Sequence, residues 1–167
     1  MDNPEQAVSS RGKAVGAPTE AASAYTAGIV DGEGCISIGR QNRKGRWLQY
    51  DLFVIVVQKD RRLTDWLYGQ WSGYRGTVQR KQGYSPGEYH RWSIHGRRAQ
   101  DMLRQILPHL RIKDEQARVA IEFQNHKHRH ATGKGYSMAE TYEPFYLRLR
   151  ALKRERAAAT TESSEPA

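Results

Sequence analysis

The chain has 167 residues, a formal net charge of +9 at pH 7 and 38% hydrophobic residues. Its length suits one domain with its own core, because domains usually hold roughly 100 to 200 residues. The single cysteine excludes an intramolecular disulfide and a zinc site built from several cysteines. The longest strongly apolar run, 52–57, is far too short to span a membrane. We therefore expect a soluble intracellular protein with no membrane partner, cytoplasmic in a prokaryote and organellar or nuclear otherwise.

The positive charge is concentrated in the middle of the chain. Residues 25–130 contain 19 Lys and Arg against 10 Asp and Glu, whereas the remainder is balanced at 8 against 8. Aromatic residues are interleaved with the basic ones, a combination typical of surfaces that bind nucleic acid. We expect an anionic partner, with nucleic acid as the first candidate and a basic domain that binds no anion as the alternative.

Composition also divides the chain. Residues 1–18 are rich in Ala, Ser, Gly and Pro without periodicity, which predicts a disordered leader. A folded domain is expected over 19–130. A C-terminal extension follows over 131–156, with a short helix over 143–155, and the tail over 157–167 is predicted to be disordered.

The first predicted helix begins at an N-cap, Thr19, and ends in glycine-rich sequence near Gly32. Ala27, Gly28 and Gly32 lie within about one and a half helical turns of each other, so their side of the helix is nearly bare backbone. Another backbone could therefore approach this side closely. Glu33 is expected to project just beyond the helix end.

Two strands follow, over 35–41 and 47–58, joined by the basic turn 42–46. Ile36 and Ile38 alternate with small and polar residues, which is typical of a strand with one buried face. The second strand is rich in aromatic and β-branched residues. The pair is predicted to form a β-ribbon with a cationic tip.

The remaining elements follow from hydrophobic periodicity and from Gly and Pro at their ends. They are a helix over 60–71 capped by Asp60, strands over 77–81 and 89–95, helices over 97–107 and 114–124, and a basic, His-rich loop over 125–134. The predicted order is α-β-β-α-β-β-α with a four-stranded sheet.

Residues 26–34 resemble the motif that names the LAGLIDADG homing endonucleases. Four positions are identical to the motif, namely Ala27, Gly28, Asp31 and Gly34. The sequence departs from the motif at Thr26, where the family has Leu, at Gly32, where Gly and Ala are interchangeable, and at Glu33, where Asp is usual. The order of the predicted elements is the one that this family's core requires. The resemblance implies an α+β fold with a LAGLIDADG-type core, whose four-stranded antiparallel sheet binds DNA.

The resemblance also implies a catalytic set. In the family, the acid at the position of Glu33 binds a divalent metal ion, Mg²⁺ or Mn²⁺, and a carboxylate is a suitable ligand for such hard ions. Segments 57–62 and 110–113 resemble those that carry the family's active-site Gln, Arg and Lys. The implied set is Glu33, Gln58, Arg62 and Lys113. The preceding acid, Asp31, is a weaker candidate, expected to form local hydrogen bonds at the helix end.

Polar side chains that alternate outward on the predicted strands are candidates for reading bases, since a two-stranded ribbon fits the major groove of B-DNA. They are Ser37, Gln41, Gln49, Asp51, Gln79, Lys81 and Arg91. Phosphate contacts are expected from the turn residues Arg43, Lys44 and Arg46. The alternative is the solvated face of a half-buried sheet, and a bulge would exchange the two rows.

One motif per chain implies a homodimer in the family. Packing of the Ala27, Gly28 and Gly32 faces of two helices would bring two Glu33 side chains together on a near-palindromic duplex. The resemblance thus implies a site-specific, metal-dependent double-strand DNA endonuclease. The alternative is a non-cleaving regulator or an RNA-splicing maturase, which could dispense with the catalytic set.

Two further features are less specific. His126, His128 and His130 alternate on the predicted loop, where phosphate contacts are favoured over a zinc site because no fourth ligand accompanies them. Cys35 is expected to be a small residue beside the site rather than a nucleophile.

Overall fold

The computed structural model describes residues 18–43, 47–82, 85–130 and 138–162. Its elements are α1 (Glu20–Glu33), β1 (Gly34–Arg43), β2 (Trp47–Gln58), α2 (Arg61–Trp71), β3 (Tyr74–Arg80), β4 (Gly87–His95), α3 (Gly96–Ile106), a 3₁₀ turn (Leu107–His109), α4 (Asp114–His130) and α5 (Met138–Glu162). The four strands form one antiparallel sheet in the order β1-β2-β4-β3. This is the predicted α-β-β-α-β-β-α order, and it confirms the α+β fold class.

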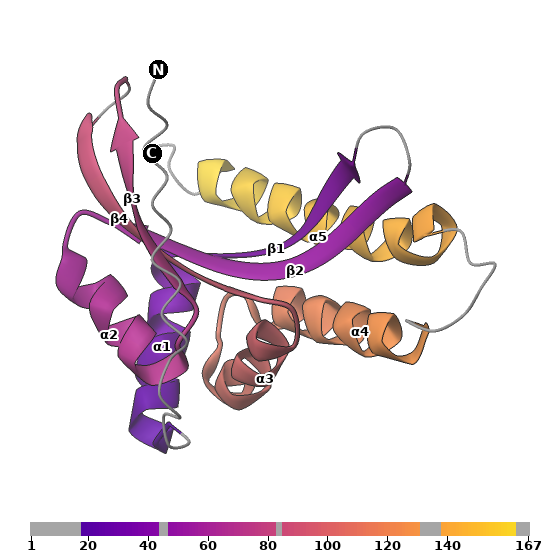
Figure 1. Ribbon diagram of the computed structural model, residues 1–167, viewed down its shortest axis with the longest axis horizontal. Helices are drawn as coiled ribbons and strands as arrows, with labels where there is room; N and C mark the ends of the chain where they lie inside the picture. The colour runs from indigo at the N-terminus through magenta and orange to yellow at the C-terminus, as the bar shows by residue number, and fades with distance from the viewer. Residues whose placement is uncertain (1–17, 44–46, 83–84, 131–137, 163–167) are drawn as a thin grey trace.

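The sheet has a covered face and an outer face. Helices α1 to α4 lie on one side of the curved sheet (Figure 1). Alternate residues of β1, β2 and β4 point into the core against these helices, among them Ile36, Leu52, Val54 and Trp92, all with no exposed side-chain area. The residues between them lie on the outer face. The alternation of apolar and polar residues in the sequence therefore correctly predicted which residues of these three strands face the core.

Helix α1 is fixed at its start and along its buried side. Thr19 Oγ1 accepts a hydrogen bond from the Ala22 amide at 3.2 Å, which confirms the predicted N-cap. Further along, Trp71 Nε1 donates to Thr26 Oγ1 at 2.9 Å in the buried contact between α1 and α2. Thr26, which departs from the family motif, thus has a structural role as an acceptor.

Helix α4 is longer than predicted, because it continues to His130. The expectation of a loop beginning at residue 125 is therefore wrong for 125–130. Tertiary contacts stabilise this last part: Lys127 Nζ donates to the Tyr50 carbonyl at 2.5 Å, and the His126 ring lies 5.6 Å from that of Phe145. These contacts join residues far apart in sequence, so local periodicity did not reveal them.

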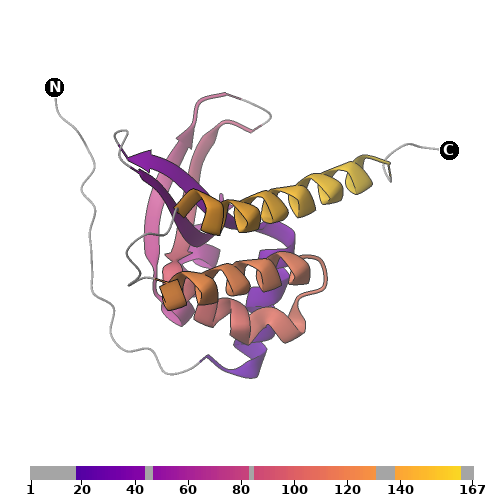
Figure 2. The same ribbon diagram turned by 90° about the vertical axis from the view of Figure 1, so that its right-hand side faces the viewer.

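Helix α5 is also longer than the short helix predicted over 143–155. It begins at Met138, continues through Pro144 and extends to Glu162, beyond residue 157, where a disordered tail was expected. Tyr142 and Leu149 are buried in the common core, and α5 packs against α4, β1 and β2. Figure 2 shows α5 alongside α4. Packing of this apolar side outweighs the cost of proline inside a helix.

Within the described residues, the helices are all too short or too polar to cross a bilayer.

Candidate active site and nucleic-acid interface

The carboxylate of Glu33 lies at a sharp turn between α1 and β1. Glu33 is the last residue of α1 and is exposed, and Gly34 begins β1 directly. A Cβ on Gly34 would lie 2.7 Å from the Val30 Cα, closer than real contacts allow. The chain can therefore leave the helix by this route only with glycine at position 34, and the turn places Glu33 at the end of α1.

Asp31 is an acceptor at the same helix end. It is 7% exposed, and its carboxylate accepts hydrogen bonds from the backbone amides of Arg111 (2.8 Å), Ile112 (3.3 Å) and Lys113 (2.9 Å). Asp31 forms hydrogen bonds at the helix end, but the expectation that they are local is wrong, because the donors are 80 to 82 residues away. The carboxylate thus holds the segment before α4 against the end of α1.

The segment before α4 places Lys113 at the end of α1. Lys113 is 5% exposed, and its ammonium donates to the carbonyls of Val30 at 2.6 Å and Gly34 at 2.7 Å. A cation at a helix C-terminus also interacts favourably with the helix dipole. Burial, and then the nearby charge of Arg156, lower the pKa of Lys113 to about 8. The structure therefore brings Lys113 and Glu33, both predicted from the motif segments, to the same end of α1.

A second lysine, Lys153 of α5, lies beside this site and was not predicted. Its Nζ donates to Ser37 Oγ at 2.5 Å and lies 3.3 Å from Cys35 Sγ. Burial raises the pKa of the Cys35 thiol, but hydrogen bonds from Ser37 and Lys153 and the charge of Lys153 bring it below its usual value. Lys113 also contributes to this lowering. No local pattern links positions 37 and 153, so the contact depends on the packing of α5.

The two other predicted catalytic residues, Gln58 and Arg62, lie where β2 ends and α2 begins. Gln58 is the last residue of β2, two residues beyond Val56, which pairs with Gly34 at the start of β1. Arg62 is exposed and forms an ion pair with Asp60 at 2.5 Å. Asp60 also caps α2, as predicted, because it accepts a hydrogen bond from the Arg62 amide at 2.9 Å. The role of Gln58 therefore stays a prediction, while Arg62 is held by Asp60.

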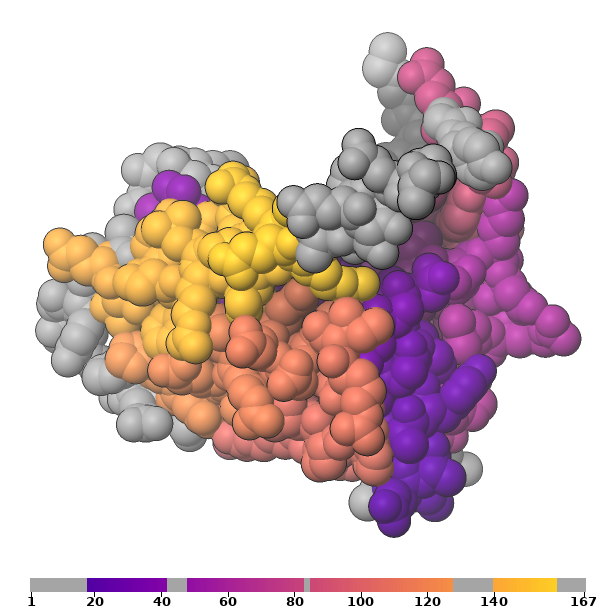
Figure 3. Space-filling view, turned by 180° about the vertical axis from the view of Figure 1, so that it is seen from behind, coloured from indigo at the N-terminus to yellow at the C-terminus, as the bar shows by residue number. Residues whose placement is uncertain are grey.

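One side of α1 is open and lined by small residues. Ala24, Gly28 and Gly32 follow each other at four-residue spacing and are exposed, and added Cβ atoms on the two glycines would meet nothing within 4 Å. In the view from behind, α1 forms part of the surface (Figure 3). Ala27, predicted in this interface, is instead fully buried in its own chain's core. Helical geometry explains the correction, because Ala27 lies one residue before Gly28 and therefore on a different side of the helix.

The predicted base-reading residues of β1, β2 and β4 lie on the outer face. Gln41 pairs with Gln49 and Gly39 pairs with Asp51, on the face opposite the core. Arg91 pairs with Val57 and lies on that face too. Ser37 belongs to the same row. The alternation therefore places Ser37, Gln41, Gln49, Asp51 and Arg91 on one surface.

The face assignment is wrong for β3. Gly76 pairs with Arg91 and Val78 with Tyr89, so these positions share the outer face, whereas Gln79 pairs with Glu88 on the other face. Lys81, on the same alternation as Gln79, follows the end of β3. The prediction placed Gln79 and Lys81 on the outer face by alternation, but Val78 lies on that face and is exposed, and β3 has no row of buried residues to set its orientation.

Other predicted residues lie outside what the structure describes. They are the side chains of Arg43, His128 and His130 and all of residues 44–46, including Lys44 and Arg46.

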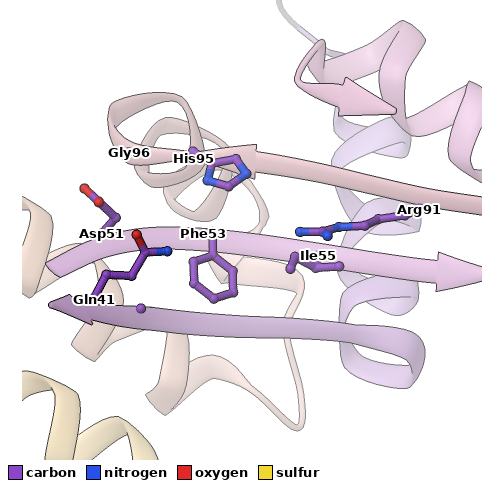
Figure 4. Close-up of a pocket in the computed structure, with 8 residues that line it drawn as sticks. Gln41, Asp51, Phe53, Ile55, Arg91, His95 and Gly96 are labelled. Carbon is purple, nitrogen blue, oxygen red and sulfur yellow. The ribbon is translucent and has the colours of Figure 1, made fainter. Parts of the chain in front are cut away.

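The outer face contains a hollow of about 500 Å³ between β1, β2 and β4. Its lining comprises Gly39, Gln41, Asp51, Phe53, Ile55, Arg91, His95 and Gly96. Figure 4 shows Phe53 and Ile55 at the centre, Gln41 and Asp51 at one end, and Arg91 extending from the opposite side. The hollow therefore combines an apolar centre with polar ends.

No protein-family model and no curated protein matches the sequence. Solved structures do match. The homing endonuclease I-CvuI in complex with its target and Ca aligns with a TM-score of 0.64 at 19% identity, covering 80% of this chain and 82% of that one. The archaeal intron-encoded homing endonuclease I-Vdi141I, complexed with DNA, aligns with a TM-score of 0.53 at 11% identity, covering 78% of this chain and 96% of that one. The LAGLIDADG homing endonuclease I-GzeII, in complex with its DNA target, aligns with a TM-score of 0.54 at 14% identity, covering 77% of this chain and 43% of that one.

These similarities show that the chain has the fold of LAGLIDADG homing endonucleases. They confirm the fold predicted from the motif and from the order of the elements.

Proposed function

We propose that the protein is a homodimeric, metal-dependent, site-specific DNA endonuclease. The observation that carries this proposal is the arrangement at the end of α1, where Glu33 is exposed and the buried ammonium of Lys113 donates to the carbonyls of Val30 and Gly34. The homing endonuclease structures that share the fold include complexes with DNA targets. The basic charge of the folded part is consistent with the same partner.

The residues at this end fit a hard divalent ion. Glu33 supplies an exposed carboxylate, the type of ligand that Mg²⁺ and Mn²⁺ prefer, and the remaining ligands would come from phosphate oxygens and water. When bound, the ion would neutralise charge on the scissile phosphate and lower the pKa of a bound water. Glu33 would hold it from the rigid turn made by Gly34.

The chain's other side chains would orient the reactants. An ammonium group has three N–H donors, and the Val30 and Gly34 carbonyls use two from Lys113, so one remains for a phosphate oxygen. Gln58 would orient a water through its amide. Arg62, once released from Asp60, would bind a phosphate. Lys153, whose ammonium donates to Ser37 Oγ and lies close to Cys35 Sγ, adds positive charge there.

The second chain would dock on the open side of α1. Gly28 and Gly32 leave space there for a close backbone approach, which would place two copies of Glu33 near one symmetry axis. Each copy would then act on one strand of a near-palindromic duplex. Mg²⁺, the homodimer and the duplex are linked parts of this proposal.

The experiment is a selection of cleaved sites from a randomised duplex library, performed with Mg²⁺, with Ca²⁺ and with the Glu33→Gln variant. We expect one near-palindromic site, cut in Mg²⁺ by the wild type only. Specific binding without cutting by the wild type in Mg²⁺ would identify a non-cleaving regulator. Preferential binding of structured RNA instead would indicate a maturase.

A further inference from the structure

The hollow on the outer face has an apolar floor that the core does not require. Phe53 and Ile55 are both half-buried and point away from the core residues of β2. The Phe53 ring lies over Gly39 of the neighbouring strand, because a Cβ on Gly39 would lie 2.8 Å from Phe53 Cε1. Glycine at position 39 thus lets an aromatic ring lie flat on the surface. This floor presents carbon to a partner on the outer face.

Arg91 forms a charged rim on one side of this floor. Figure 4 shows its side chain extending beside Ile55 toward Phe53 and His95. Within the described part of the chain, no carboxylate forms an ion pair with Arg91, and its buried Nε has no hydrogen-bond partner. An unpaired buried donor is costly, so an acceptor that draws out the guanidinium would be favoured.

The neighbouring polar groups leave Arg91 as the dominant charge. Burial, and then the charge of Arg91, lower the pKa of His95, while Asp51 has a weaker opposing effect. His95 is therefore neutral at neutral pH. The carboxylate of Asp51 already accepts hydrogen bonds from Gln49 at 2.7 Å and Lys127 at 2.6 Å. The rim thus offers donors from Arg91 beside an apolar floor.

We infer that this hollow binds the C5-methyl group of a pyrimidine, next to a guanine bound by Arg91. In the major groove the C5-methyl group is the apolar feature of a base edge, and guanine presents two acceptors, O6 and N7, that match a guanidinium. A phosphate would use Arg91 but not Phe53 and Ile55. The inference rests on the proposed function, because it assumes that duplex DNA lies on the outer face.

The methyl group has two sources, thymine and 5-methylcytosine. Burial of one methyl group corresponds to about a fourfold change in affinity. We expect that replacing thymine by deoxyuridine at one position of each half-site weakens binding about fourfold. Replacing cytosine by 5-methylcytosine at that position should strengthen binding by a similar factor. The base present in the selected unmodified site then identifies the natural source.

The test measures affinity for the selected duplex, with deoxyuridine placed at each thymine in turn. Phe53→Ala should remove the difference between thymine and deoxyuridine at the sensitive position. Val78→Ala is the matched control, because Val78 lies exposed on the same face but outside the hollow, and this variant should keep the difference. If Phe53→Ala does not fold by circular dichroism, Ile55→Ala is measured in the same way.

A second arm tests the guanine. Replacing N7 of the neighbouring guanine by carbon should weaken binding by the wild type about tenfold, but should have little effect on binding by the Arg91→Ala variant. The inference is wrong if no position responds to loss or gain of the methyl group, or if Phe53→Ala and Ile55→Ala keep the response. A protein that binds no duplex specifically would instead overturn the proposed function.

Discussion

The end of α1 and the outer face of the sheet differ in how fully their polar groups are paired within the chain. At the end of α1, Asp31 accepts three backbone hydrogen bonds and Lys113 donates two. On the outer face, Gln41 is exposed and the Nε of Arg91 has no partner among the described residues. The first region is fixed before any ligand arrives, whereas the second retains donors and acceptors for one.

This difference matches two separate tasks. A reacting group must be held to within a fraction of an ångström, and saturated buried hydrogen bonds provide such rigidity. Base recognition needs groups whose hydrogen bonds are completed only by the correct partner, so that a wrong base leaves them unpaired. Substitutions at the end of α1 should therefore affect cleavage or stability strongly, and substitutions on the outer face should change preference by smaller factors.

The largest effect is expected for Glu33→Gln. Loss of the carboxylate removes the proposed metal ligand, and we expect cleavage to fall at least about a thousandfold, since metal stabilisation of a transition state supplies several kcal/mol. Because Glu33 is exposed, thermal stability and DNA affinity should change little. Single-turnover cleavage of the selected duplex measures the first effect. Glu20→Gln, at the other end of α1, is the control with the same charge change and should cut normally.

Asp31→Ala should cause the largest loss of stability. It would leave three backbone amides without their acceptor, and breaking such a charged, buried hydrogen-bonding group costs about 3 kcal/mol. Urea unfolding measures the loss. Asp101→Ala, which removes an exposed carboxylate from α3, should cost less than about 0.5 kcal/mol. Equal effects of the two substitutions would show that Asp31 does not hold the segment before α4.

Gly28→Leu should prevent dimerisation. The new side chain would project into the open side of α1, where the second helix is proposed to pack, while open space leaves the monomer undisturbed. Gly69→Leu is a matched control, because Gly69 is also helical and exposed with nothing within 4 Å. Sedimentation velocity should show a monomer for the first variant and a dimer for the second. A stable Gly28→Leu dimer would place the interface elsewhere.

Much of this architecture follows from the sequence, and the exceptions have identifiable causes. The α1 motif, the N-caps Thr19 and Asp60 and the alternation of β1 and β2 are local signals, and the structure confirms them. The errors concern β3, which lacks a buried row, Ala27, which is buried in its own core, and the helices α4 and α5, whose bounds depend on tertiary packing. Lys153 was missed for the same reason, since its partners precede it by more than 110 residues.

The pH dependence of stability tests the burial of Lys113. Its pKa falls from 10.5 to about 8 on folding, so between these values the unfolded chain holds the proton that the folded chain has lost. Stability should therefore rise as the pH increases from about 8 toward 10.5, and should not change through this group below 8. Urea unfolding should show this rise for the protein that retains Lys113 but not for the Lys113→Met variant. Both proteins carry Cys35→Ser, because the Cys35 thiol would otherwise change stability with pH in the same direction.

The smallest effect is expected for Lys153→Gln, which tests whether the two regions meet. Lys153 belongs to α5, yet it donates to Ser37 on the outer face and lies beside Cys35, next to the end of α1. If it binds a phosphate there, affinity should fall several-fold for every sequence alike, and the slope of log affinity against log salt should decrease by about 1. Arg148→Gln removes the same charge from α5, at a residue paired with Glu122, and should leave the slope unchanged. An unchanged slope for Lys153→Gln would show that Lys153 makes no phosphate contact and that α5 has only a packing role. Lys113 would then be the lysine that contacts DNA at the end of α1.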